Sequence, residues 1–179
     1  CGNQPELFAA LTKNGINPAK ASQVTIVNQP FDMNLFLQKK IDAAAAMTYN
    51  ELAQVLETKN PDTGKLYQLS DLNVFKMDSA AVGTGMLEDN VFVTENWLNK
   101  PGNKTTAVQF LKASFQGWIY CRDHQASCVN IVLKNGPTLG AGHQAWQMNE
   151  INALVWPNPS GIGLVPASAV AQTAAIAKK

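Results

Sequence analysis

The sequence predicts an α/β fold in which a parallel-rich sheet is flanked by helices, followed by a helical C-terminal part. Two observations support this prediction. Short apolar or β-branched runs alternate with helical segments through the first half of the chain, which is typical of a parallel sheet with crossover helices. From Lys104 onward, apolar residues recur at helical spacing instead. The chain has 179 residues, of which 46% are hydrophobic and 15% charged, so it holds enough apolar material for a core.

The first half supplies the strands and helices of the predicted sheet. A helix begins at Asn3, which can cap it with Glu6 in the capping-box position, and ends at Asn14-Gly15. Ile41–Met47 is an apolar run of the length of a buried strand, interrupted only by Asp42. The other elements expected here, in chain order, are a strand over Val24–Val27, a helix over Phe31–Lys40 with Phe31, Leu35 and Phe36 inward, a helix over Asn50–Glu57, a strand over Leu72–Phe75 and extended segments over Gly83–Thr94.

The second half is predicted to form helices. Asn135-Gly136-Pro137 ends one of them, and Pro166 begins the last, alanine-rich one. The earlier helices are expected to start near Lys104 and to cover Ala126–Lys134 and Gly142–Val155. Their inward residues are expected to be, on the first, Ala107, Phe110, Leu111, Phe115, Trp118 and Ile119, and, on the third, Trp146, Ile151 and Leu154.

Charge and motif content exclude several function classes. The formal net charge is +1 and no long basic run occurs, so we expect no nucleic-acid partner. No apolar run approaches the ~18 residues that read as a membrane span. The sequence lacks a Walker loop, a GxGxxG motif and a serine in a nucleophile elbow. These features favour a binding protein over an enzyme, with no catalytic residue, cofactor or metal assigned.

The end of the Ile41–Met47 run is the first candidate binding site. In an open parallel sheet, ligands bind at the carboxyl ends of strands, where helix N-termini also point. Tyr49, Asn50 and Glu51 stand at that junction. Tyr49 offers a ring face and a hydroxyl, and Glu51 is a charged acceptor suited to an amino group or a protonated ring nitrogen. The alternative is a plain capping motif, in which Asn50 caps the next helix beside a surface tyrosine.

Two further positions leave a binding role open. The helix that begins at Asn3 has unsatisfied backbone N–H groups that favour an anionic or carbonyl-bearing ligand, although plain capping explains it as well. Trp156 lies in the loop Trp156–Gly161, where two prolines hold the ring rigidly. This ring is either structural or a ligand contact.

The three cysteines divide into a pair and a single residue. Cys121 and Cys128 are seven positions apart, at the end of one predicted helix and near the start of the next. A turn there brings their α-carbons within the ~4.4–6.8 Å that a disulfide needs, which favours a bridge and an oxidising compartment. A metal site that includes His124 is the weaker alternative, because the C-x₂-C spacing and a fourth ligand are missing. Cys1 is the first residue of the given sequence, as a lipid-modified cysteine is in mature lipoproteins. Lipidation of Cys1 is therefore kept as an alternative.

Four segments in order resemble one known family. They are "GNQPELFAALTKNGINP", "VTIVNQPFDMNLFLQKKIDAAAAMTYNELAQVL", "GTGMLEDNVFVTENWL" and "AVQFLKASFQGWIYCRD". Together they resemble the ABC-importer substrate-binding proteins related to thiamine-pyrimidine synthase, and "IDAAAAMTYNE" is the most specific part. The resemblance implies the type II periplasmic-binding fold, with two α/β lobes around a ligand. It implies that residues 1–75 form the second lobe and residues 84–179 the return to the first lobe plus the C-terminal helices, with the usual first lobe absent.

The resemblance also implies a function. Family members bind small aromatic heterocycles, so we expect an extracytoplasmic solute-binding protein that takes a thiamine-precursor pyrimidine or a riboflavin-like vitamin and docks on an ABC permease. It is periplasmic, or membrane-anchored through a lipid on the full-length protein. By position, the binding residues are expected to be Tyr49, Asn50, Glu51, Asn3, Glu88 and Trp156. The alternatives are a thiamine-pyrimidine-synthase-type enzyme and a non-transport ligand-sensing module.

Overall fold

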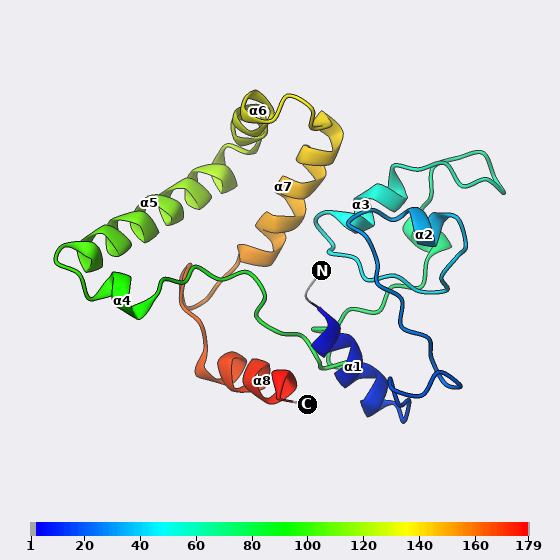
Figure 1. Ribbon diagram of the computed structural model, residues 1–179. Coiled ribbons are helices and arrows are strands. Elements are labelled where there is room, and N and C mark those ends of the chain that lie inside the picture. Colours follow the sequence, from blue (N-terminus) through cyan, green and yellow to red (C-terminus); the bar gives the residue numbers. More distant parts are fainter. Residues whose placement is uncertain (1–2, 179) are drawn as a thin grey trace. The chain divides into compact units, whose positions relative to one another are not determined.

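The computed structural model describes residues 3–178. The lipidation considered for Cys1 therefore falls on a position outside the described residues. The chain divides into two compact units (Figure 1). Unit 1 comprises Cys1–Glu88 and Val165–Lys179, and unit 2 comprises Asp89–Leu164. The assignment of residues 1–75 and 84–179 to two lobes stays a prediction, because this division does not test it. Among the described residues, no helix is long and apolar enough to cross a membrane.

Unit 1 is built from short helices and long irregular segments. Helix α1 packs against α8 from the other end of the chain, and this pair brings the two parts of the unit together. The buried apolar side chains of the unit are Met33, Ala53, Val55 and Ile176. Its helices are α1 (Gln4–Lys13), α2 (Asn34–Leu37), α3 (Glu51–Leu56), the 3₁₀ helix η1 (Leu69–Asp71) and α8 (Ala167–Ala177).

Unit 2 is a set of consecutive helices (Figure 1). They are α4 (Glu95–Leu98), α5 (Asn103–Asp123), α6 (Gln125–Asn135) and α7 (Ala141–Val155). Only His124 separates α5 from α6, and α6 packs against both α5 and α7. Gly136 follows α6 directly, and Pro166 stands in the N-cap position of α8. The helices predicted for the second half are therefore confirmed. Their observed ends differ by no more than one or two residues from the ends that the sequence predicted.

The predicted parallel-rich sheet is wrong, because the part of the chain that the structure describes is helical and contains no strand. Its single β-type contact is an isolated antiparallel bridge between Lys59 and Leu66. Val24–Val27 and Leu72–Phe75 have no regular secondary structure, most of their residues are exposed, and Phe75 reaches 76% exposure. A strand needs a neighbouring strand to satisfy its backbone groups. Apolar composition alone does not provide that neighbour.

The run Ile41–Met47 satisfies backbone groups with side chains instead of a strand. The side-chain amide of Gln29 donates to the Ala45 carbonyl oxygen and accepts from the Ala45 N–H, both at 2.9 Å. The Met47 N–H donates to Oε2 of Glu51 at 3.1 Å. A glutamine amide thus takes the place of a partner strand at Ala45, because one carboxamide offers a donor and an acceptor side by side.

Two predictions for the first-half helices need correction. Helix α2 covers only Asn34–Leu37 of the expected Phe31–Lys40, and Phe31 is exposed. Lys39, with φ of 56°, lies in the left-handed region and prevents the helix from continuing. At α1, the Asn3 side chain makes no capping hydrogen bond, and the buried Glu6 carboxylate binds Met86 rather than closing a capping box.

The inward faces expected in unit 2 are only partly correct. Helix α5 has no buried side chain, and Phe110 is 58% exposed. Of the six residues expected inward, Ala107, Leu111 and Phe115 are half-buried and lie at four-residue spacing. The other two expected residues, Trp118 and Ile119, are exposed. On α7 the buried residues are Gln144, Met148 and Asn152. Of the residues expected inward, Trp146 and Ile151 are half-buried and Leu154 is exposed. The buried stripe of α7 is therefore largely polar.

Candidate functional site

The junction before α3 places Tyr49, Asn50 and Glu51 in unit 1 as consecutive residues. Asn50 is in the N-cap position but its side chain makes no capping hydrogen bond to α3, so the plain capping alternative has no support there. Glu51 is the first helical residue and is only 3% exposed, while Tyr49 and Asn50 are half-buried. An acidic side chain in the first turn is also favoured by the helix dipole.

The Glu51 carboxylate holds the chain that leads into α3. Its Oε2 accepts from the N–H of Met47, four residues earlier. The N–H of Leu52 binds the Met47 carbonyl oxygen at 3.2 Å, which closes the same turn from the backbone side. The geometry combines an aromatic ring with an ordered, buried carboxylate.

The other candidate residues lie on different elements. Asn3 precedes α1, and its carbonyl oxygen accepts from the N–H of Leu7 at 3.3 Å. Glu88 is exposed and follows Leu87, whose N–H donates to Oγ1 of Thr173 on α8. Trp156 belongs to unit 2, where it ends α7. Of the candidates, the structure gathers Tyr49, Asn50 and Glu51 at one junction, and the ligand role of all six remains a prediction.

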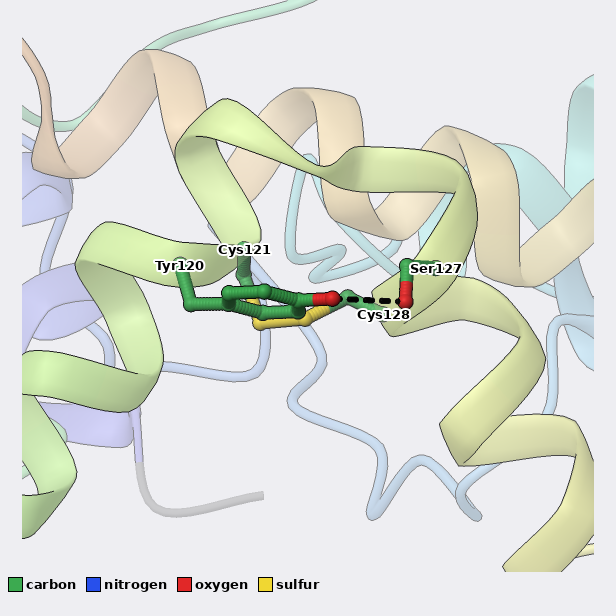
Figure 2. The surroundings of a disulfide bond; sticks show 4 residues. All are labelled: Tyr120, Cys121, Ser127 and Cys128. Carbon is green, nitrogen blue, oxygen red and sulfur yellow. Dashed lines mark hydrogen bonds between the residues drawn. A yellow bond between two sulfur atoms is a disulfide. The ribbon is translucent and has the colours of Figure 1, made fainter.

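The corner between α5 and α6 carries a disulfide between Cys121 and Cys128, the pairing favoured by the sequence (Figure 2). The two α-carbons are 5.4 Å apart, and Cys128 is buried. The Tyr120 hydroxyl and Oγ of Ser127 lie 2.9 Å apart and hydrogen-bond beside the bridge. The His124 ring contacts the Tyr120 ring at 4.5 Å between centroids. Among the described residues, no group of three or more histidine, cysteine, aspartate or glutamate side chains is placed to hold a metal ion.

Next to the bridge, Arg122 contacts two partners. Its Nε and Nη2 donate to the Asp123 carboxylate at 2.7 and 2.9 Å. The hydrogen bond from Arg122 lowers the pKa of Asp123, and the same bond raises the pKa of Arg122. The Arg122 guanidinium also lies over the Trp156 ring, 4.7 Å from its centroid, in a cation–π contact.

Comparison with known proteins decides the family. The model of the family described as NMT1/THI5 like matches residues 2–127. The chain belongs to this family. No curated protein and no solved structure matches the chain.

The NMT1/THI5-like family covers solute-binding proteins of ABC transporters and thiamine-synthase-like proteins, and its members are generally small-molecule-binding proteins. The matched region contains Asn3, Glu88 and the whole Tyr49–Glu51 junction, whereas Trp156 lies beyond it. Family membership therefore supports a binding role for unit 1 residues more directly than for Trp156.

Sequence reasoning missed Gln29, which binds the backbone of Ala45, and Asn152, which is buried on α7. Gln29 is recognisable only through its contact with Ala45, sixteen residues away, and no local signal marks it. Asn152 has a signal in the sequence, because it lies at four-residue spacing from Met148 and Gln144 and four residues before Trp156. That spacing defines one helix face, but a polar face is ordinarily read as the solvent side.

Proposed function

We propose that this protein is an extracytoplasmic solute-binding protein of an ABC importer that binds a small aromatic heterocycle. One observation within the family match supports this proposal above all others: Tyr49 stands two residues before the buried, ordered carboxylate of Glu51. The Tyr49 ring stacks on the heterocycle, and the Glu51 carboxylate accepts from its amino or protonated ring nitrogen group. Thiamine-precursor pyrimidines and riboflavin-like vitamins are the two ligand types that match this chemistry.

Binding in this proposal depends on removing the ring faces from water. An aromatic pair is worth ~0.5–1.5 kcal/mol beyond its buried area, and a hydrogen bond to a charged group adds ~1.5–3 kcal/mol. The bound form then docks on the permease. The protein itself carries out no reaction, since its candidate residues hold and orient a ligand.

Calorimetry with Glu51→Gln tests the ligand role. Glutamine keeps an acceptor for the Met47 N–H but removes the charge, so we expect binding of the thiamine pyrimidine or riboflavin to weaken at least tenfold with little change in folding. Glu57→Gln is the matched control, because it makes the same chemical change at an exposed position that directly follows α3. An unchanged affinity in Glu51→Gln excludes Glu51 as the residue that reads the ligand.

Thermal shift with a panel of pyrimidines, thiamine and riboflavin tests the binder class itself. A ligand at ~100-fold excess over its Kd adds ~2.7 kcal/mol to the free energy of unfolding, which raises Tm measurably. The absence of a shift with every heterocycle rejects the proposal. Iron bound by the purified protein, together with formation of a pyrimidine product, favours the synthase-type alternative instead. Uptake of the labelled ligand by cells with and without the protein tests the transporter role.

A further inference from the structure

Helix α5 carries an open surface hollow near its start, between two lysines. The hollow has a volume of about 350 Å³ and is lined by Lys104, Thr105, Val108, Gln109 and Lys112. Lys104, Val108 and Lys112 follow one another at four-residue spacing, so they lie in one row along the helix. Val108 stands at the centre of this row and is 50% exposed. We call this surface the α5 hollow.

The positive charge of the α5 hollow is not balanced within the helix. Helix α5 has no acidic residue before Asp123, and Asp123 pairs with Arg122. Among the residues that the structure describes, neither Lys104 nor Lys112 has an ion-pair partner. Both lysines are exposed. The α5 hollow therefore presents an apolar centre between two positive charges that are available to a partner.

This arrangement matches the face of an acidic amphipathic helix. A helix rises about 1.5 Å per residue, so positions 104 and 112 are about 12 Å apart along the axis of α5. A second helix packed alongside has side chains at the same spacing. If it carries a carboxylate four residues before and four residues after an apolar residue, each carboxylate lies opposite one lysine and the apolar side chain lies on Val108. Such charge complementarity selects one partner over others.

The same charges argue against a second copy of the chain and against a membrane. In an antiparallel pair of α5 helices centred on Val108, Lys104 of each copy faces Lys112 of the other, and a parallel pair places each lysine beside its own counterpart. Like charges that face each other disfavour both pairings. Anionic membranes are recognised by clusters of about four to eight basic residues, whereas two line the α5 hollow.

We propose that the α5 hollow is a docking surface for an acidic amphipathic helix of a partner protein. Val108 makes the apolar contact, and Lys104 and Lys112 each pair with one carboxylate. Thr105 and Gln109 form the neighbouring row and supply polar groups at the edge of the contact. This surface belongs to unit 2, and its role does not depend on whether the protein binds a heterocycle.

Nuclear magnetic resonance of the ¹⁵N-labelled protein with a helical peptide tests the proposal. The probe is an alanine-based peptide of about 16 residues, long enough to form a helix, with the pattern Glu-x-x-x-Leu-x-x-x-Glu. We expect it to shift the backbone amide signals of residues 104–112 saturably. The same peptide with glutamine in place of both glutamates is expected to bind at least tenfold more weakly. The affinity of the acidic peptide should also fall between about 0.01 M and 1 M salt, because the Debye length falls from about 30 to 3 Å.

A double substitution tests the two lysines. Lys104→Gln with Lys112→Gln is expected to weaken binding of the acidic peptide at least tenfold. Lys65→Gln with Lys134→Gln makes the same change in net charge at two other exposed positions, so we expect it to bind the peptide like the wild-type protein. Since all four lysines are exposed, both variants are expected to keep the wild-type circular dichroism spectrum.

A single substitution tests the apolar centre. Val108→Glu places a negative charge between the lysines and is expected to abolish binding of the acidic peptide. Val170→Glu is the matched control, because Val170 of α8 is 51% exposed and lies in unit 1. This control is expected to leave the affinity unchanged.

Several outcomes overturn the proposal. They are the absence of a saturable shift, equal binding of the acidic and glutamine peptides, and an affinity of the Lys104→Gln, Lys112→Gln protein equal to that of its control. If the signals of residues 104–112 shift with protein concentration alone, a second copy occupies the surface instead. Binding to phosphatidylserine vesicles without any response to the acidic peptide assigns it to a membrane. None of these outcomes affects the Glu51→Gln measurement, so the two proposals are judged separately.

Discussion

The Glu6 carboxylate accepts a hydrogen bond from the backbone N–H of Met86 at 2.5 Å, across 80 positions of the chain. Glu6 lies on α1 and is 7% exposed. From α8, Gln172 donates to the Gly85 carbonyl oxygen at 2.7 Å, and Oγ1 of Thr173 accepts from the Leu87 N–H at 3.0 Å. Side chains of two helices therefore hold the successive residues 85–87, and this segment links α1 to α8.

Replacement of Glu6 is expected to loosen this segment. Glu6→Ala leaves the Met86 N–H without an acceptor and is expected to lower the free energy of unfolding of unit 1 by about 1–3 kcal/mol. Glu6→Gln keeps an acceptor and is expected to cost less. Hydrogen exchange at the Met86 amide is the direct measurement, and its protection should fall in Glu6→Ala. If the Met86 amide were equally protected in Glu6→Ala and Glu6→Gln, the role of the carboxylate as its acceptor would be contradicted.

Gln29 is expected to be as important for unit 1 as an apolar core residue. Gln29→Leu removes both hydrogen bonds to Ala45, which are half-buried, and is expected to lower the free energy of unfolding by about 1 kcal/mol for each bond lost. Urea unfolding followed by circular dichroism measures the change. Gln38→Leu, at an exposed position just after α2, serves as the control and should have little effect. A Gln29→Leu protein as stable as the control would show that Ala45 does not need this partner.

The contrast between the two halves of the chain explains what the sequence predicts well. Gly136 and Pro166 mark helix ends through their own backbone preferences, and the structure confirms them because such signals are local. The strand expected over Ile41–Met47 depended on a partner strand elsewhere, and the partner is the side chain of Gln29. A contact between two segments that are far apart in the sequence cannot be predicted from the pattern of apolar and polar residues in either segment alone.

The candidate sites follow the same rule. The sequence locates Tyr49, Asn50 and Glu51 at a helix start because the change from an apolar run to polar residues is visible in the chain. It does not reveal that Glu51 is buried against the Met47 N–H. Asn152 was not identified, since a polar residue on a helix is taken to face water until packing shows the contrary.

The disulfide is expected to stabilise unit 2. Closing a loop with seven-residue separation between Cys121 and Cys128 restricts the unfolded chain by about 2–3 kcal/mol. Replacing both cysteines with serine is therefore expected to lower the free energy of unfolding of unit 2 by a similar amount. All four tryptophans lie in this unit, so their fluorescence reports on it specifically.

A thiol count provides an independent check of the bridge. The chain has three cysteines, so a titration under denaturing, non-reducing conditions is expected to find one free thiol, that of Cys1. Three reactive thiols under the same conditions would exclude the bridge between Cys121 and Cys128. After reduction all three should react, which controls for accessibility.

The Arg122–Asp123 pair is expected to give unit 2 a specific dependence on pH. Because the hydrogen bond from Arg122 lowers the pKa of Asp123 in the folded protein, the pair stabilises the fold above the unfolded-state pKa of about 3.9. That stabilisation is lost as the pH falls through the lowered pKa. Both side chains are partly exposed, so the effect is small.

Asp123→Asn is the variant that measures this contribution. At pH 7 the wild-type protein is expected to have the higher Tm by tryptophan fluorescence, and the difference should shrink toward zero as the pH falls below the folded-state pKa of Asp123, because the wild-type carboxyl group is then also neutral. In an Arg122→Met background the same substitution should have little effect at any pH, since the partner is gone. A Tm difference that widens on acidification would contradict the sign of the pKa shift and with it the role of the ion pair.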